Sequence, residues 1–249
     1  MEIKRPTKQV YSNYNKEDQV VWETLFNRQM ELLRPIVSNQ YLKALQMVGF
    51  KSDKIPNFID VNMVLHNITG WSLEVVPNIS AQKEFFTFLS KRKFTATCWL
   101  RTMKQLDYLE EPDMFHDVFG HVPLLLNHNY VNFFKGISEI ALKHIDNLKA
   151  IELLGKVYWF TIEFGLINED NCVKIYGAGI ISSKGETENC MLSTAKKIAF
   201  DIQTIFDTNF RTDIFQDCYF VIDSFEQLYN SLTDIELLLE ENLMEIDQK

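Results

Sequence analysis

The stretch EEPDMFHDVFGHVPLL, residues 110–125, holds two histidines, His116 and His121, with four residues between them. Imidazole is a common neutral ligand of iron, zinc and copper. In an ideal α-helix, residues five apart point about 140° away from each other. Both histidines can bind one metal if the turn widens to π geometry, and Gly120 lowers the steric barrier to that distortion. The spacing therefore predicts an irregular helix, unless one histidine is a helix cap and the other a core residue.

A carboxylate that could join the histidines lies in GKVYWFTIEFGLI, residues 155–167, where apolar side chains flank Glu163. These neighbours predict a buried carboxylate, which is costly unless a metal or a cation offsets its charge. Two histidines and one carboxylate form the ligand set that leaves open positions on non-haem iron(II). A buried salt bridge of Glu163 is the alternative. Asp113 and Asp117, beside His116, suit supporting roles in which they orient an imidazole N–H or a water.

The composition is that of a folded, mainly helical protein. Of 249 residues, 46% are apolar and 24% charged, and glycine and proline are scarce. No repeat or linker divides the chain, so we expect a weakly ordered segment over 1–14 and a single domain over 15–249. A net charge of −9 argues against nucleic-acid binding. Because the chain shows neither a signal peptide nor a membrane-length apolar run, we expect a cytoplasmic protein that does not enter a membrane.

The apolar spacing predicts an α+β fold that is mainly helical, with a few short strands. Asn15 is expected to cap the first helix, Ser38 the second and Ser80 the fourth, while Gly49 ends the second. Ser224 is expected to cap the last helical region. Residues 173–183 form a strand or turn unit. Helices are predicted over 15–35, 38–49, 56–67, 80–91, 112–121, 130–146, 151–166 and 187–208, and strands over 71–76, 94–100 and 218–222.

A longer pattern joins four segments in order along the chain. They are WLRTMKQLDYLEEPDMFHDVFGHVPLL (99–125), YWFTIEFGL (158–166), YGAGIISSKGE (176–186) and FQDCYFVIDSFEQ (215–227). This pattern resembles the pterin-dependent aromatic amino acid hydroxylases, which act on phenylalanine, tyrosine or tryptophan. The resemblance implies the single catalytic domain of that family. It also implies Fe(II) held by His116, His121 and Glu163, with tetrahydropterin and O₂ as cosubstrates.

The resemblance also assigns residues to the amino acid substrate. Arg101 stands where the family binds the substrate carboxylate, and a bidentate arginine–carboxylate pair suits that task. Ser182 matches a serine that supports the bound amino acid and a nearby histidine ligand. Trp159 and Phe164 match residues that line the pocket for the aromatic ring. Tyr108 and Pro112 border that pocket.

The pterin residues follow in the same way. Phe85 matches the phenylalanine that stacks on the pterin ring, and Ile79 and Ser80 match its backbone-contacting loop. Tyr158 faces the pterin side, and Asp117 stands where many relatives contact the pterin through water. Glu186 matches an acid behind the site. Two departures stand out: Leu109 replaces a threonine of the animal enzymes near the substrate carboxylate, and the pterin loop has the sequence PNISAQKEF.

The identity of Trp159 and the compact chain favour conversion of L-phenylalanine to L-tyrosine, with tyrosine or tryptophan as alternative substrates. Since the regulatory and coiled-coil regions of the animal enzymes are not in this sequence, we expect a monomer that binds small molecules. Two other classes are alternatives. The pair His116-Asp117 also occurs in HD-type metal phosphohydrolases, for which His66, His128 and His144 are available. A non-catalytic binding protein could share the fold.

Overall fold

The computed structural model describes residues 5–107 and 109–247. Helices dominate, and short strands separate them. The α-helices are α1 (Lys16–Leu33), α2 (Asn39–Val48), α3 (Phe58–Ile68), α4 (Gln82–Ser90), α5 (His128–Lys143), α6 (Leu148–Tyr158), α7 (Ala178–Ser182), α8 (Lys184–Asn189), α9 (Ile202–Asp207), α10 (Phe225–Asn230) and α11 (Leu232–Asp247). The strands are β1 (Ser72–Val75), β2 (Lys93–Ala96), β3 (Leu166–Glu169), β4 (Cys172–Ile175), β5 (Lys196–Ala199) and β6 (Cys218–Ile222). Other helical turns are the 3₁₀ segments Tyr11–Asn13, Met103–Gln105 and Val122–Leu126 and the π-helices Phe115–His121 and Trp159–Glu163.

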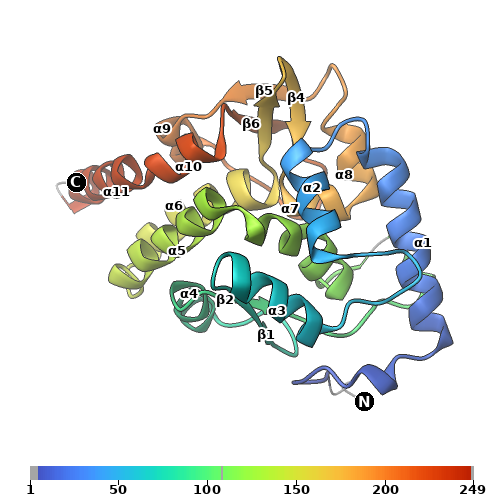
Figure 1. Cartoon of the computed structure of the whole chain (residues 1–249). Helices are drawn as coiled ribbons and strands as arrows, with labels where there is room; N and C mark the ends of the chain where they lie inside the picture. Colours follow the sequence, from blue (N-terminus) through green and yellow to red (C-terminus); the bar gives the residue numbers. More distant parts are fainter. Residues whose placement is uncertain (1–4, 108, 248–249) are drawn as a thin grey trace.

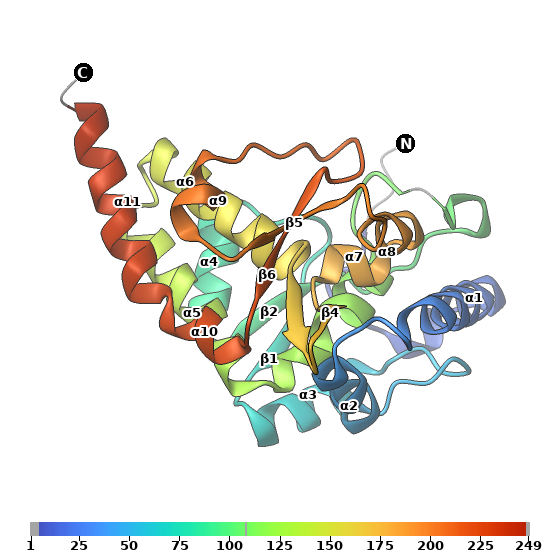
Figure 2. The same cartoon turned by 90° about the horizontal axis from the view of Figure 1, so that it is seen from above.

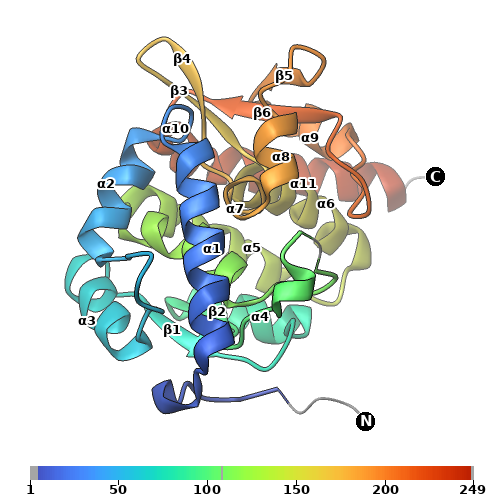
Figure 3. The ribbon, with the colours of Figure 1, turned by 90° about the vertical axis from the view of Figure 1, so that its right-hand side faces the viewer.

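Two small sheets lie at opposite ends of the molecule, with α5 and α7 between them (Figures 1 and 3). In one sheet β1 pairs in parallel with β2. The other has the strand order β4-β3-β6-β5, in which β3 and β4 form an antiparallel hairpin and the other pairs are parallel. Asp170 and Asn171 connect the hairpin with φ of 53° and 60°, as a type I′ turn requires. Helix α11 runs along the side of the molecule away from α1 (Figure 2).

Helix α1 begins where the sequence predicts and packs directly on the functional segment. The Asn15 side chain accepts hydrogen bonds from the backbone N–H groups of Glu17 and Asp18, and the Asp18 carboxylate accepts one from the backbone N–H of Asn15. This capping box satisfies N–H groups that the first turn leaves unpaired. One turn on, the fully buried Trp22 meets Phe115 at 5.6 Å between ring centroids. The first helix thus supports the π-helix Phe115–His121.

Most predicted elements are present, and the exceptions have local causes. Ser38 caps α2, and Gly49 ends it with φ 77°. The prediction of one helix over 187–208 is wrong, because turns after α8 lead into β5, which pairs with β6 before α9 begins. The predicted cap at Ser80 is also wrong: α4 follows Ala81, which makes no side-chain cap hydrogen bond. The strand β3 was not predicted, since its residues continue the apolar pattern of the helix before it.

The N-terminal segment, expected to be weakly ordered, makes specific hydrogen bonds within its described part. The side-chain amide of Gln9 donates to the carbonyl of Pro56, at 2.9 Å. The hydroxyl of Tyr14 donates to the carbonyl of Cys98, at 2.8 Å. Residues 9–14 are therefore attached to the segments that lead into α3 and follow β2. Within the described residues, no helix combines the length and apolar character needed to cross a bilayer.

A close backbone contact joins the end of the second π-helix to the start of α7. The backbone N–H of Gly177 donates to the carbonyl of Gly165, at 2.9 Å. A Cβ atom on Gly177 would lie only 2.4 Å from the carbonyl oxygen of Glu163 and 2.5 Å from the backbone nitrogen of Gly165. Both neighbours are backbone atoms, so neither can rotate away. A side chain at position 177 would therefore clash with this backbone. The contact holds the backbone of Glu163 and Gly165 against the start of α7.

We expect Gly177→Ala to lower the free energy of unfolding by about 1–3 kcal/mol, the usual cost of forcing an extra carbon into a packed interior. Gly155→Ala is the matched control. A Cβ at Gly155, within α6, meets nothing within 4 Å, and alanine there should stabilise the helix by up to about 1 kcal/mol. Urea unfolding of both variants measures the difference. Equal free energies of unfolding in the Gly177→Ala and Gly155→Ala variants would mean that the backbone contact at Gly177 is not tight.

Candidate active site

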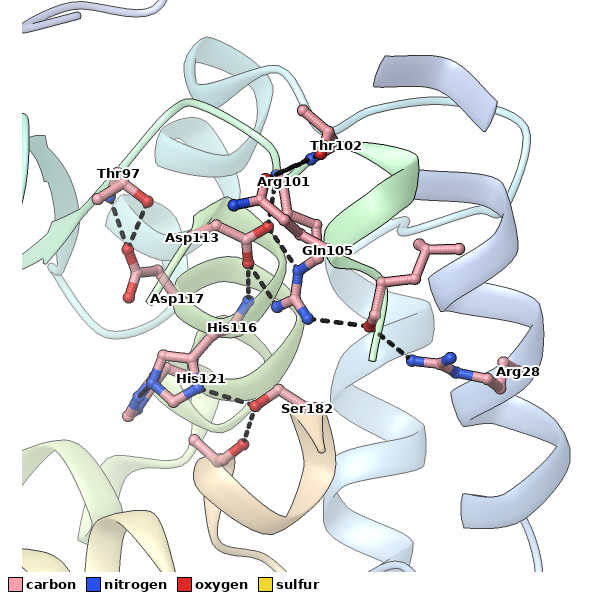
Figure 4. A network of polar contacts seen from close by, with 12 residues as sticks. Arg28, Thr97, Arg101, Thr102, Gln105, Asp113, His116, Asp117, His121 and Ser182 are labelled. Atoms are coloured by element: carbon pink, nitrogen blue, oxygen red, sulfur yellow. Dashed lines mark hydrogen bonds and ion pairs between the residues drawn. The ribbon is translucent and has the colours of Figure 1, made fainter. Parts of the chain in front are cut away.

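The first π-helix brings the two histidines together, as the spacing predicts. Over Phe115–His121 the helical turn is widened, and Nε2 of His116 lies 3.4 Å from Nε2 of His121 (Figure 4). Gly120 has a different role from the expected one. A Cβ on it would lie 3.0 Å from the carbonyl oxygen of Ala178, so this glycine allows α7 to approach closely.

Glu163 arrives from the second π-helix, Trp159–Glu163. Its Oε1 lies 3.3 Å from Nε2 of His121, and its Oε2 lies 3.7 Å from Nε2 of His116. Each of the three residues therefore offers one potential metal-binding atom, and these three atoms all lie within 4.8 Å of one another. Asp117, although next to His116 in sequence, is not in this group. Its Oδ2 accepts from the backbone N–H and the hydroxyl of Thr97, at 2.7 and 2.8 Å.

A hydrogen-bond chain sets which nitrogen of His116 is free. The Ser182 hydroxyl donates to the carbonyl of Ala178, at 2.8 Å, so it must accept from Nδ1–H of His116, also at 2.8 Å. The lone pair then lies on Nε2, which faces His121 and Glu163. Burial lowers the pKa of His116 to about 4, so this imidazole is neutral near pH 7. Ser182 on α7 thus prepares His116 as a nitrogen donor.

The electrostatics of the three side chains fit a divalent metal ion. Burial raises the pKa of Glu163, but in the acidic range, where the histidines carry positive charge, His121 and His116 outweigh it and hold that pKa at about 2. Among the described residues, the buried Nδ1 of His121 has no hydrogen-bond partner, and the imidazole packs against Phe94 at 4.8 Å between ring centroids. Two neutral imidazoles and one ionised carboxylate are the donor set that iron(II) takes with open positions. The residues present therefore fit a mononuclear iron ion.

A buried ion pair lies beside this cluster. Nε and Nη2 of Arg101 donate to Oδ2 and Oδ1 of Asp113, at 2.9 and 2.8 Å, and the Asp113 side chain is fully buried. Oδ1 of Asp113 also accepts from the backbone N–H of His116, at 3.3 Å. Asp113 therefore contacts the backbone of His116, while Ser182 holds the imidazole. A single carboxylate links the predicted carboxylate-binding arginine to a predicted metal ligand.

The residues predicted to line the pocket for the substrate ring pack against other aromatic side chains, and a hydrogen bond orients Trp159. Trp159 lies 4.5 Å from Phe164 and 4.4 Å from Phe210 between ring centroids. Its indole N–H donates to Oε1 of the buried Gln216, at 2.9 Å. The backbone N–H of Gln216 donates to Glu186, at 3.0 Å. Glu186, predicted to lie behind the site, thus acts on it through Gln216 and Trp159.

The predicted pterin residues lie on the other side of Glu163. Phe85 on α4 meets Tyr158 edge to face, at 5.6 Å between ring centroids, and Tyr158 directly precedes the π-helix that carries Glu163. Ile79 is 73% exposed, so an apolar side chain is available to a ligand there. Ser80 is partly buried in the same loop. Phe85 and Tyr158 therefore lie next to the π-helix that carries Glu163.

Some predicted and some unpredicted residues need separate mention. Tyr108 falls outside the described residues, and Pro112 is half-buried directly before Asp113. Sequence reasoning missed Thr97, Phe210 and Gln216. Gln216 lies in the segment 215–227 that matched the family pattern, which was the one available signal. Thr97 and Phe210 depend on contacts between distant segments, for which the sequence offers no spacing rule.

We expect Asp113→Asn to lower the free energy of unfolding by about 3 kcal/mol, because it leaves the buried Arg101 without its counter-charge. Asp107→Asn is the matched control. Asp107 forms an ion pair with Arg28, but its side chain is 85% exposed, so its loss should cost less than about 1 kcal/mol. Urea unfolding at neutral pH measures both. Equal losses would contradict the importance of the Arg101–Asp113 pair.

Comparisons with known proteins agree with this geometry. Residues 2–244 match the model of the family described as biopterin-dependent aromatic amino acid hydroxylase. The phenylalanine-4-hydroxylase of Chromobacterium violaceum is 41% identical over 224 residues, which cover 90% of this chain and 75% of that protein. That of Ralstonia nicotianae is 42% identical, covering 88% and 70%.

A solved structure of the Chromobacterium violaceum enzyme, with bound iron(III) and oxidised cofactor 7,8-dihydrobiopterin, is also similar. It aligns with a TM-score of 0.88 and 40% identity, over 95% of this chain and 86% of that chain. A family match over nearly the whole chain, relatives above 40% identity and a shared fold lead to one conclusion. This chain belongs to the biopterin-dependent aromatic amino acid hydroxylase family.

Proposed function

We propose that this protein hydroxylates L-phenylalanine to L-tyrosine, with Fe(II), O₂ and a tetrahydropterin. The observation that carries the proposal is the convergence of His116, His121 and Glu163 beside Arg101, which is paired with the buried Asp113. The first group suits iron, and the second suits an amino acid carboxylate. The phenylalanine-4-hydroxylases to which the chain is similar support the choice of substrate.

The three predicted ligands would hold the iron, which when bound supplies a centre for activating O₂ with the pterin so that oxygen is transferred to the aromatic ring. Glu163 stays ionised because its pKa is about 2, and His116 stays neutral because its pKa is about 4. Ser182 keeps the proton of His116 on Nδ1. These residues thus keep the donor set ready across the neutral pH range.

Arg101 retains hydrogen-bonding capacity for a carboxylate. Of the five N–H donors of a guanidinium, one on Nε and one on Nη2 go to Asp113, and one on Nη1 goes to the carbonyl of Leu106. Counting only partners among the described residues, one N–H therefore remains on each terminal nitrogen. Two parallel donors form the fork that binds a carboxylate bidentately. We assign this fork to the α-carboxylate of the amino acid.

The remaining assignments concern the two ring systems. Trp159 and Phe164 would orient the substrate ring by edge and face contacts. Phe85 would stack on the pterin, with Ile79 and Ser80 contacting its edge and Tyr158 at the boundary between the two ligands. Asp117 would act on the pterin side through water. Tyr108 and Pro112 would border the substrate.

A product assay tests the reaction. We expect purified protein loaded with Fe(II) to form tyrosine from L-phenylalanine in air with a tetrahydropterin, and a chelator to abolish that activity. Tyrosine and tryptophan, offered at equal concentration, rank the substrates. Faster formation of 5-hydroxytryptophan would contradict the choice of phenylalanine. No hydroxylated product from any of the three, with iron bound, would favour a non-catalytic binding protein.

Removal of the carboxylate ligand should remove the metal. We expect Glu163→Ala to weaken iron binding by more than about 100-fold, since loss of even a supporting residue costs 10- to 100-fold, and to abolish tyrosine formation. Glu188→Ala, at an exposed carboxylate, should keep its iron. Metal analysis after dialysis measures both. Two metal ions per wild-type chain would instead favour the phosphohydrolase alternative.

We further propose a monomer. Ile235 and Leu239, on the apolar side of α11, are fully buried, and α11 packs on α5, α6 and α9 of the same chain. The helix that would be available for a coiled coil is thus already covered along part of its length. Sedimentation analysis checks this state.

A further inference from the structure

Helix α1 holds the segment that follows Arg101 at two separate points. Near its start, Oε1 of Glu17 accepts from the backbone N–H of Met103, at 3.0 Å. Three turns further, Arg28 reaches the same segment. Its Nη2 donates to the carbonyl of Leu106, at 3.1 Å, and its Nη1 lies 2.6 Å from Oδ1 of Asp107. Nothing in the family pattern assigns a role to Arg28.

The carbonyl of Leu106 is shared by two guanidinium groups. It accepts from Nη2 of Arg28, at 3.1 Å, and from Nη1 of Arg101, at 3.3 Å. Figure 4 draws the side chains of Arg28 and Arg101 with these hydrogen bonds as dashed lines. A carbonyl oxygen has two lone pairs and can serve both donors. Arg28 on α1 therefore shares a hydrogen-bond acceptor with the residue assigned to the substrate carboxylate.

The contact between Nη1 of Arg101 and the carbonyl of Leu106 lies beside the donors of Arg101 that remain free. Asp113 holds the Nε side of the guanidinium, and Leu106 holds Nη1. The position of the Leu106 carbonyl depends in turn on Arg28. The two side chains of the Arg28–Asp107 ion pair differ in exposure: that of Asp107 is 85% exposed and that of Arg28 is 23% exposed. Water screens the exposed Asp107, so part of the positive charge of Arg28 remains uncompensated near the carboxylate fork.

We propose that Arg28 is a positioning residue for the α-carboxylate of the amino acid substrate. It holds the Leu106 carbonyl against Nη1 of Arg101 and adds positive charge behind the two free N–H groups. The role deepens the proposed function and rests on it for the identity of the substrate. Carboxylate binding itself does not require turnover, and this allows a separate test.

Steady-state kinetics of Arg28→Met test the role. We expect KM for L-phenylalanine to rise roughly tenfold, the effect of losing about 1.4 kcal/mol of binding, while kcat and the KM for the pterin stay within about twofold. Arg28→Lys keeps a donor and the charge, and should restore part of the loss. Asp107→Ala removes the exposed partner alone and should leave KM unchanged.

Glu17→Ala is the control for a merely structural role, since it removes the other attachment of α1 to the same segment. If it raises KM as much as Arg28→Met does, loosening of the segment explains the effect and the proposal is wrong. An unchanged KM in Arg28→Met would also overturn it. Thermal unfolding of each variant checks that the KM values being compared come from folded proteins.

Binding of two analogues separates the proposal from the reaction. Calorimetry with 3-phenylpropionate, which keeps the carboxylate, should give weaker binding to Arg28→Met by roughly tenfold. 2-Phenylethylamine, which lacks the carboxylate, should bind both proteins equally. Equal weakening of both analogues would refute a role at the carboxylate. If the wild-type protein forms no tyrosine, the proposed reaction fails, and the analogue comparison still decides the role of Arg28.

Discussion

Two imidazoles five residues apart in one helix, those of His116 and His121, must point to the same place. The neighbouring elements pack in a way that permits this geometry. A regular α-helix would turn them away from each other. The widened turn over Phe115–His121 resolves this, but it disturbs the usual hydrogen-bond ladder. Neighbouring elements compensate: the buried hydroxyl of Tyr41 on α2 donates to the displaced carbonyl of Phe119, at 2.8 Å. Trp22 on α1 supports Phe115 from the other side.

The second π-helix, Trp159–Glu163, must bring Glu163 to the same two histidines. Glu163 ends a widened turn, and Gly177 lets the start of α7 lie against its backbone. That same short helix carries Ser182, which fixes the tautomer of His116. Helix α7 therefore sets both the distance between Glu163 and the histidines and the protonation of one of them. Backbone packing and hydrogen bonds therefore contribute to holding the three predicted ligands in place.

The sequence was most informative where chemistry and local spacing coincide. The caps at Asn15 and Ser38 follow from side chains that bond their own helix, and the wide turn between the histidines follows from a periodicity argument. The failure at 187–208 has a different origin, because β5 exists through pairing with β6, which no local pattern records. The same holds within the site for Gln216, whose bond to Trp159 joins residues far apart in the chain. The roles of most site residues came from resemblance to a family, and spacing alone would have left Trp159 in the core.

The wide turn has a consequence for the metal that this helix can serve. A π turn corresponds to an α-helical turn with one residue inserted. Deletion of a single residue between His116 and His121 would restore regular α-helical geometry and leave the histidines four apart, the spacing of zinc-binding helices. Such a helix presents its imidazoles in the arrangement that tetrahedral zinc accepts. One residue of chain length thus separates a helix suited to an open iron site from one suited to zinc.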